Sequence, residues 1–131
     1  MNFLMVALGG GIGAICRYAI SLIPIKSQFP FITLIVNLLG AIFIGFIVGF
    51  AESRKMSSNT SLFLKVGFCG GFTTFSTFSA QALQLLQSGH RLLGMTYILT
   101  SAIVCILMTW VGTSLTEKLI KFPTFGRTKD F

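Results

Sequence analysis

The feature of this sequence that most limits its fold is an apolar run, Phe31 to Ala51, that contains no charged side chain. A helix of about 20 apolar residues can cross the roughly 30 Å hydrocarbon core of a bilayer. Three further apolar runs fill most of the remaining chain. The sequence therefore predicts an all-α integral membrane protein with four transmembrane helices, at about 3–23, 31–51, 62–86 and 92–116.

Composition argues against a soluble domain. Of the 131 residues, 53% are hydrophobic and 10% charged, whereas soluble globular chains carry about 25% charged residues. The three cysteines are odd in number and widely spaced, which favours reduced packing residues over a disulfide framework. The net charge of +7 does not indicate nucleic acid, because the basic residues are scattered and flank the apolar runs, as expected for contacts with lipid headgroups.

The polar segments 52–61 and 87–91 separate the runs, so we expect one transmembrane domain over 1–131 with a short C-terminal tail at 117–131. Four helices place both termini on one side, and basic residues favour the cytoplasmic side. Seven cations on the side of the termini against three on the other predict termini inside: Arg54, Lys55, Lys65, Lys118, Lys121, Arg127 and Lys129 against Arg17, Lys26 and Arg91. Four helices are too few to enclose a water-filled path, so we expect an oligomer.

The most informative polar cluster lies in the third predicted helix, at residues 67–79 (GFCGGFTTFSTFS). Glycine pairs weaken a helix and hydroxyl side chains bond to freed backbone groups, which predicts a break. Carbonyls exposed by such a break can hold a cation. Phe75 and Phe78 are three residues apart and share a face if the helix resumes. Their partly positive ring edges, next to hydroxyl donors, suit a small anion; the alternative is core packing.

Other polar residues at membrane depth allow two interpretations each. Arg17, the only charge well inside a predicted helix, either reaches the headgroups or attracts anions at a pore mouth. Asn37 either joins two helices or donates hydrogen bonds to a passing anion. Tyr97, Ser101 and Cys105, four residues apart, form a polar stripe or a helix contact. The glycines at 9–13 predict close helix packing, since no strand and no Walker lysine accompany them.

Taken together, these motifs resemble the Fluc (CrcB) family of fluoride channels, and the resemblance covers all four predicted helices. The matching segments are 9–18 (GGGIGAICRY), 33–40 (TLIVNLLG) and 67–79. The resemblance implies a dual-topology homodimer of two antiparallel copies in the inner (plasma) membrane. It also implies two fluoride pathways along the subunit interface and a structural sodium ion at the dimer centre. Equal insertion both ways would balance the cations, which still count five to three without Arg127 and Lys129.

The same resemblance implies roles for individual residues. Phe75 and Phe78 would contact fluoride, and Asn37 would be the pore amide. Ser76 and Thr77 lie in the same motif, and Ser101 is similar in position to a polar residue of the pathway on the fourth helix. Gly70 and Thr73 would supply backbone carbonyl ligands to the sodium ion. The predicted fluoride route, with Arg17 at the vestibule, therefore consists of Arg17, Asn37, Phe75, Ser76, Thr77, Phe78 and Ser101, and Gly70 and Thr73 belong to the predicted sodium site.

Fluoride is small and strongly hydrated, so a selective pore must replace its water with hydrogen-bond donors. We expect passive export of cytoplasmic fluoride and no enzymatic activity, because the sequence contains no nucleotide site or proton-carrying carboxylate in a predicted helix. One alternative is a small cation-coupled multidrug exporter, which needs an acidic residue within the membrane, whereas Glu52, Glu117 and Asp130 lie at helix ends or in the tail. The other alternative is a non-transporting membrane scaffold, for which the glycine-rich faces would suffice.

Overall fold

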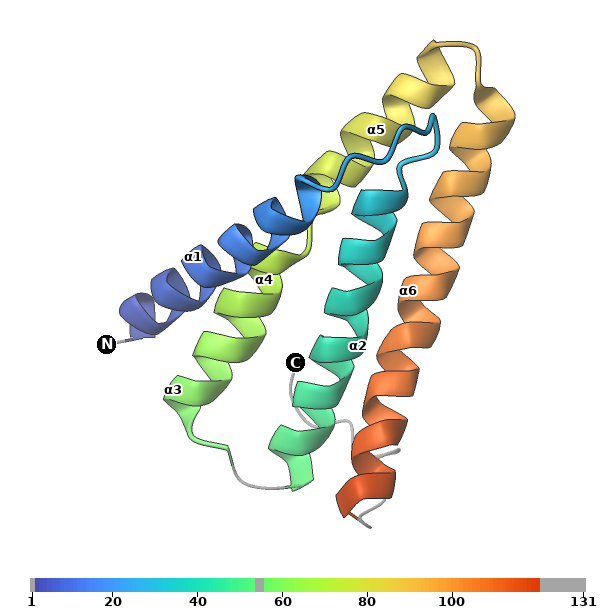
Figure 1. Cartoon of the computed structure of the whole chain (residues 1–131). Helices are drawn as coiled ribbons and strands as arrows, with labels where there is room; N and C mark the ends of the chain where they lie inside the picture. Colours follow the sequence, from blue (N-terminus) through green and yellow to red (C-terminus); the bar gives the residue numbers. More distant parts are fainter. Residues whose placement is uncertain (1, 54–55, 121–131) are drawn as a thin grey trace.

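The computed structural model describes residues 2–53 and 56–120, and this part of the chain is helical with no strand. Figure 1 shows the helices in chain order. Three of them are long and apolar enough to cross a membrane, which confirms an all-helical integral membrane protein. The helices are α1 (Asn2–Ser21), α2 (Phe31–Ser53), α3 (Ser58–Ser61), η1 (Leu62–Cys69), α4 (Gly70–Phe72), α5 (Phe75–Gln87) and α6 (Arg91–Ile120).

Two helices depart from the predicted bounds at their C-terminal ends. Helix α1 ends at Ser21 instead of Ile23, because a residue before proline disfavours the helical conformation and Pro24 follows Ile23. The Ser21 hydroxyl donates to the Tyr18 carbonyl at 2.6 Å in the last turn. Helix α2 extends to Ser53, two residues past the predicted 51.

The other two predicted helices also differ at their ends. The third segment begins at Ser58, before the predicted 62, because the Ser57 side chain accepts a hydrogen bond from the Thr60 N–H at 3.2 Å and caps the first turn. Helix α6 continues to Ile120 instead of 116, since no glycine or proline intervenes and charged side chains at a helix end can reach the interface. The rest of the predicted tail, from 121 on, and the cations Arg54 and Lys55 lie outside the described residues.

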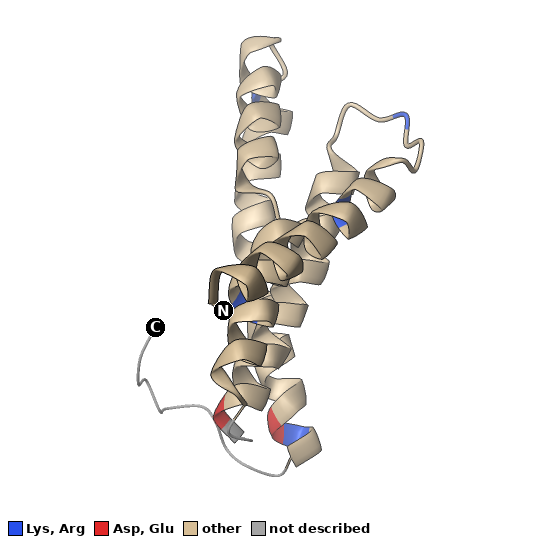
Figure 2. Ribbon diagram, turned by 90° about the vertical axis from the view of Figure 1, so that its left-hand side faces the viewer, with Lys and Arg blue, Asp and Glu red and all other residues tan. Residues whose placement is uncertain are grey.

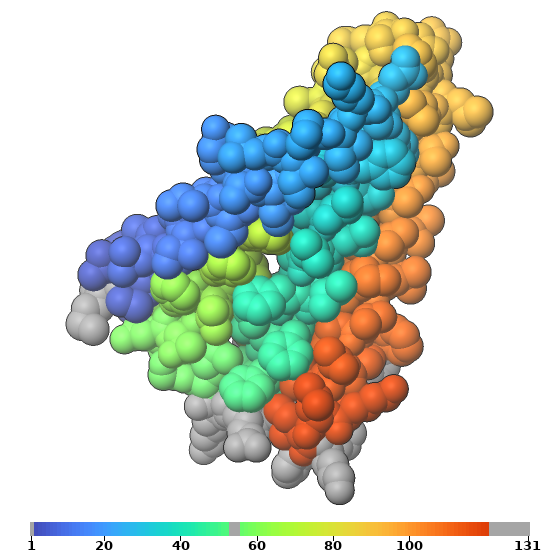
Figure 3. All heavy atoms as spheres, viewed as in Figure 1, coloured from blue at the N-terminus to red at the C-terminus, as the bar shows by residue number. Residues whose placement is uncertain are grey.

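The bundle consists of two closely packed pairs. Helix α2 packs along α6, and α1 packs across η1 and α4 (Figures 1 and 3). Glycines permit both contacts. A Cβ atom at Gly112 would clash with the Ile42 carbonyl oxygen, and one at Gly13 would clash with the Phe68 carbonyl oxygen. The prediction that the glycines at 9–13 serve close helix packing is thus confirmed for Gly9 and Gly13, which are buried against the η1 backbone.

The side chains on the outside of the bundle suit contact with lipid and not with water. Large apolar side chains lie on the outside along α1 and α6, such as Phe3 and Ile106, while the charged residues of the described chain lie mostly toward helix ends and loops (Figure 2). A small aromatic core forms where α5 meets α6 around Tyr97, which is fully buried. Gly89 turns the chain between these two helices with φ 86°, a backbone conformation that glycine adopts without steric cost.

Candidate functional site

The helical conformation stops at Phe72 and resumes at Phe75. Between these residues the backbone is extended, with φ −74° and ψ 158° at Thr73 and φ −145° and ψ 102° at Thr74. The Thr74 hydroxyl caps the new helix: its Oγ1 accepts from the Thr77 N–H at 3.2 Å and donates to Thr77 Oγ1 at 2.8 Å. Thr74 therefore supplies the N-cap that lets α5 start here.

Asn37 of α2 stabilises this interruption by two hydrogen bonds to the Thr74 backbone. Its Nδ2 donates to the Thr74 carbonyl at 3.3 Å, and its Oδ1 accepts from the Thr74 N–H at 2.8 Å. Both backbone groups of Thr74 are thus satisfied by one side chain. An amide NH₂ group carries two hydrogens, so one remains for another acceptor. The geometry gives Asn37 the helix-joining role and leaves it able to serve as a donor.

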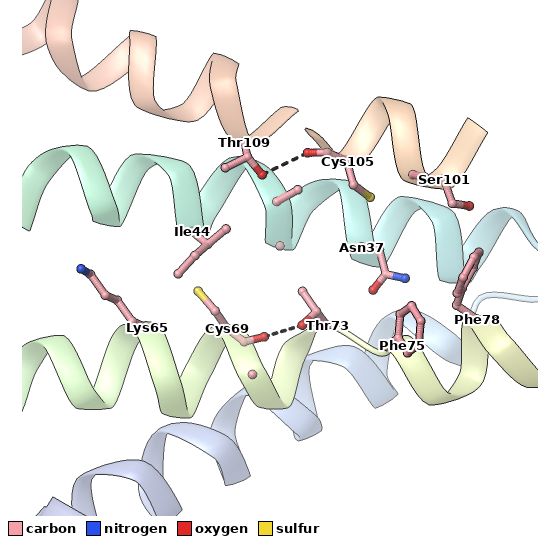
Figure 4. Close-up of a pocket in the computed structure, with 14 residues that line it drawn as sticks. Asn37, Ile44, Lys65, Cys69, Thr73, Phe75, Phe78, Ser101, Cys105 and Thr109 are labelled. Atoms are coloured by element: carbon pink, nitrogen blue, oxygen red, sulfur yellow. Dashed lines mark hydrogen bonds between the residues drawn. The ribbon is translucent and has the colours of Figure 1, made fainter. Parts of the chain in front are cut away.

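A groove with a volume of about 510 Å³ runs between α2, α6 and the segment from η1 to α5 (Figure 4). Most of the predicted site residues come together in its wall, although they belong to three separate stretches of sequence. Those that line the groove are Asn37, Gly70, Thr73, Phe75, Phe78 and Ser101. Its wall is otherwise mainly small or apolar, so an ion within it meets mostly neutral groups.

Ser101 lines this groove and carries a buried hydroxyl. The residue is 6% exposed, and its Oγ has no hydrogen-bond partner among the described residues. A buried polar atom without a partner costs about 1 to 3 kcal/mol, so such atoms are rare unless a water or ligand completes them. Cys105 and Thr109 continue the same face of α6 along the groove, and the Thr109 hydroxyl donates to the Cys105 carbonyl at 3.0 Å.

The two phenylalanines differ in how firmly the chain holds them. Their ring centroids lie 5.5 Å apart with planes tilted by 44°. Phe78 also packs on the buried Tyr97 ring at 5.2 Å, and the Tyr97 hydroxyl donates to Gln81 Oε1 at 3.1 Å. Phe75 is 79% exposed in the single chain. The Phe78 ring is therefore held in place by Tyr97, whereas most of the Phe75 ring is free to contact groups outside this chain.

Three predicted site residues lie outside the groove wall. Arg17 is half-buried, and its Nε donates to the Gly71 carbonyl at 3.1 Å, so it supports the end of α4. Ser76 is exposed on α5, and the Thr77 hydroxyl accepts a hydrogen bond from the Thr74 hydroxyl. The place of Arg17 at a vestibule stays a prediction.

Two residues that matter here were not singled out by the sequence analysis. Thr74 is the backbone anchor of the interruption, a role that its place in the hydroxyl-rich motif could have suggested. Lys65 lines the groove, although its position near the start of the third predicted helix indicated a membrane end.

The carbonyl groups of Gly70 and Thr73 are suited to a hard cation, which prefers oxygen ligands. In a continuous helix they would accept from the N–H groups of Thr74 and Thr77. Here the Thr74 N–H donates to Asn37 Oδ1 and the Thr77 N–H donates to Thr74 Oγ1. Space next to Gly70 is open, since a Cβ there would meet nothing within 4 Å. The described residues contain no cluster of three His, Cys, Asp or Glu side chains that could hold a metal.

Comparisons with known proteins identify the family of this chain. The family model described as CrcB-like protein, Camphor Resistance (CrcB), matches residues 4–113. A fluoride-specific ion channel FluC of Shewanella denitrificans is 41% identical over 117 residues, covering 87% of this chain and 94% of the relative. A protein of the same name from Flavobacterium psychrophilum is 37% identical over 118 residues (87% and 95%), and one from Idiomarina loihiensis is 39% identical over 125 residues (92% and 96%). The family match and these identities, extending over the helices that build the groove, make this chain a member of the CrcB family.

Proposed function

We propose that this protein is a fluoride-selective channel of the plasma membrane that lets cytoplasmic fluoride leave the cell passively. The relatives named as fluoride-specific channels support the choice of ion. The observation that carries the proposal is the buried Ser101 hydroxyl, which has no hydrogen-bond partner within residues 2–53 and 56–120, in a groove that Asn37 and Phe78 also line. These groups offer hydrogen-bond donors and ring edges in place of a hydration shell. The activity is transport, and the protein is not an enzyme.

Neutral donors suit fluoride because they stabilise the ion without trapping it. A small anion that enters the groove loses water and gains the free Asn37 hydrogen, the Ser101 hydroxyl and the partly positive edges of Phe75 and Phe78. Each contact is weaker than an ion pair, so the anion can leave again, as conduction requires. We also assign to the route Ser76 and Thr77, at the start of α5, and Arg17, which donates a hydrogen bond to the Gly71 carbonyl in α4.

The segment from Ser58 to Gln87 would cross the membrane as a fourth span, interrupted at Thr73 and Thr74. The N–H groups of Thr73 and Thr74 and the Thr74 carbonyl are bonded there to protein groups, as an irregular backbone at membrane depth requires. The groove is open along one side in a single chain, and the few polar groups in its wall, among them Asn37 and Lys65, would be unfavourable against lipid. We assign a second copy, antiparallel to the first, as its cover, so that the exposed Phe75 ring packs at the interface and each dimer holds two routes.

A sodium ion held by the Gly70 and Thr73 carbonyls would join the two copies. When bound, it would supply a positive charge that attracts the partly negative carbonyl oxygens. Two carbonyls are fewer ligands than a hard cation takes, so the matching pair from a second copy would complete its shell. Asn37 contributes indirectly, because it accepts from the Thr74 N–H, the group that would bond to the Gly70 carbonyl in a continuous helix.

The two alternatives have less support. A cation-coupled drug exporter needs a carboxylate within the membrane, whereas the acidic residues of the described chain, Glu52 and Glu117, lie in the last turns of α2 and α6. A scaffold would need the glycine contacts but would give no reason for a buried hydroxyl without a partner. The named relatives are channels and favour neither alternative.

Fluoride efflux from proteoliposomes tests the proposal. The wild type should release fluoride and retain chloride, and Phe75→Ile and Phe78→Ile should slow release at least tenfold, because isoleucine has no ring edge. Phe3→Ile is the matched control, since Phe3 is 92% exposed near the start of α1, away from the groove. Wild-type rates in both groove variants would refute the pore assignment, and no efflux from any protein would favour a scaffold.

Replacement of sodium by a large organic cation tests the cation site. Fluoride efflux should slow when N-methyl-D-glucamine replaces sodium on both sides, and it should recover when sodium is restored. Equal rates in the two cations would count against Gly70 and Thr73 as ligands while leaving the fluoride route intact.

A further inference from the structure

Among the described residues that line the groove, Lys65 alone carries a charge. It lies on η1, where the turns are π-helical and wider than α-helical ones. Figure 4 shows its side chain in the space between η1 and α2, at the opposite end of the groove from Phe75 and Phe78. Cys69, one turn further along the segment, lines the groove as well, so this face of η1 is turned toward the groove.

No neighbour in the described part of the chain neutralises the Lys65 ammonium group. It makes no ion pair or hydrogen bond with any residue in the described part of the chain. Its side chain is half-buried, and a half-buried charge interacts with a second ion more strongly than one in bulk water does. A cation placed in this way makes the potential of the groove positive at one end.

Arg17, a second cation within a helix of the described chain, is arranged differently. Its guanidinium donates to the Gly71 carbonyl, and the residue does not belong to the groove wall. Of the two, Lys65 is the one whose charge borders the open space that an ion would occupy.

On the basis of the proposed fluoride function, we propose that Lys65 is the electrostatic entry residue of the fluoride route. Its charge raises the concentration of anions at its end of the groove, and the neutral donors near Ser101 and Phe78 then select among them. Charged clefts with walls of low dielectric constant concentrate ions of opposite sign. The ammonium group is strongly hydrated and mobile on its stem, so it attracts fluoride without holding it tightly.

A different reading places Lys65 in contact with lipid headgroups, to which long basic side chains extend. The two readings differ in their dependence on salt. Attraction of an ion through partly aqueous space weakens as ionic strength rises, because the screening length falls from about 30 Å at 0.01 M to about 3 Å at 1 M salt. A role in folding or in lipid contact would change the rate by the same factor at every salt concentration.

The test compares fluoride efflux from proteoliposomes that contain the wild type, Lys65→Gln, Lys65→Arg or Lys65→Met. Sodium is held constant, and ionic strength is varied with an impermeant salt such as potassium isethionate. The matched control is Lys118→Gln, because Lys118 is an exposed cation at the end of α6 and does not line the groove. Elution volume and circular dichroism in detergent verify that each variant is folded.

We expect Lys65→Gln and Lys65→Met to conduct about fivefold more slowly than the wild type at low ionic strength, as for one charge acting across about 8 Å in a medium of dielectric constant about 40. At high ionic strength the difference should shrink below about twofold. Lys65→Arg and Lys118→Gln should conduct like the wild type throughout.

Two results would overturn the assignment of Lys65 alone: wild-type rates in Lys65→Gln at low ionic strength, or an equal loss in Lys65→Gln and Lys65→Arg at every ionic strength. If one neutral variant fails to fold, the other decides the comparison. If neither folds, a wild-type rate that does not change with ionic strength overturns the inference. No fluoride efflux from the wild type would refute the proposed function and this inference with it.

Discussion

Replacement of Asn37 by alanine tests how the interruption after Phe72 is held. The change removes two hydrogen bonds, from Nδ2 to the Thr74 carbonyl at 3.3 Å and from the Thr74 N–H to Oδ1 at 2.8 Å. At about 1 kcal/mol for each bond, and up to about 1 kcal/mol for each Thr74 group left without a partner, the variant should lose about 2 to 4 kcal/mol of unfolding free energy. At about 4 °C per kcal/mol for a chain of this length, the apparent Tm should fall by about 8 to 16 °C.

Thermal unfolding in detergent, followed by circular dichroism, measures this loss, and efflux from proteoliposomes measures conduction. Asn37→Ala should lower both, because the same amide holds the backbone and faces the groove. Asn37→Asp keeps the acceptor for the Thr74 N–H but not the donor, so its Tm should fall less than that of the alanine variant. Its negative charge should nevertheless stop fluoride conduction. Asn2→Ala, at the exposed start of α1, is the control and should change neither property.

The outcome distinguishes two roles for the amide. If Asn37→Ala conducts poorly but unfolds at the wild-type temperature, Asn37 serves the anion only and does not hold the interruption. If it unfolds at the wild-type temperature and also conducts normally, neither role stands.

Two further changes test the packing and the unpartnered hydroxyl. Gly112→Ala should destabilise the protein strongly, by about 2 kcal/mol or more, because the added methyl group meets the Ile42 carbonyl oxygen. Gly11→Ala, where nothing lies within 4 Å, should leave the Tm unchanged or raise it slightly, and equal effects of the two alanines would contradict the packing described for α2 and α6. Ser101→Ala should keep or raise the Tm, since it removes a buried hydroxyl without a partner, yet it should slow fluoride efflux several-fold. A large loss of stability in Ser101→Ala would mean that the hydroxyl has a structural partner.

The site could be predicted only in part from sequence, because some of its features depend on neighbouring residues in the chain and others depend on contacts with distant ones. The likelihood of an interruption near Gly70 follows from neighbouring residues, and the structure has extended backbone at Thr73 and Thr74, within the predicted segment. Ser101 was placed on the route through family resemblance, whereas its unpartnered hydroxyl is visible only once α6 packs beside α2. Thr74 was not singled out, because its partner Asn37 is 37 residues away in the chain.

The charged residues show the same limit. Counting cations along the sequence placed Lys65 among those at a membrane end and made Arg17 the charge of interest. In the structure, the surroundings of the two cations are the opposite of this expectation. The Arg17 side chain meets the Gly71 carbonyl, while Lys65 borders the groove. The turn in which a residue lies is a local property, but the neighbour that faces it depends on the rotation and register of a second helix.

The sequence by itself determined that this chain folds within a bilayer, because transfer of apolar surface out of water adds up residue by residue and needs no knowledge of contacts. It also determined which segments are helical and where one of them is weak. The tertiary structure alone decided which face of each helix meets which neighbour, since that depends on contacts such as those of Gly45 with Thr109 and Gly13 with Phe68. Close approach at these glycines fixes the register, and the register is what brings Asn37, Phe78 and Ser101 to one groove with Lys65 at its end.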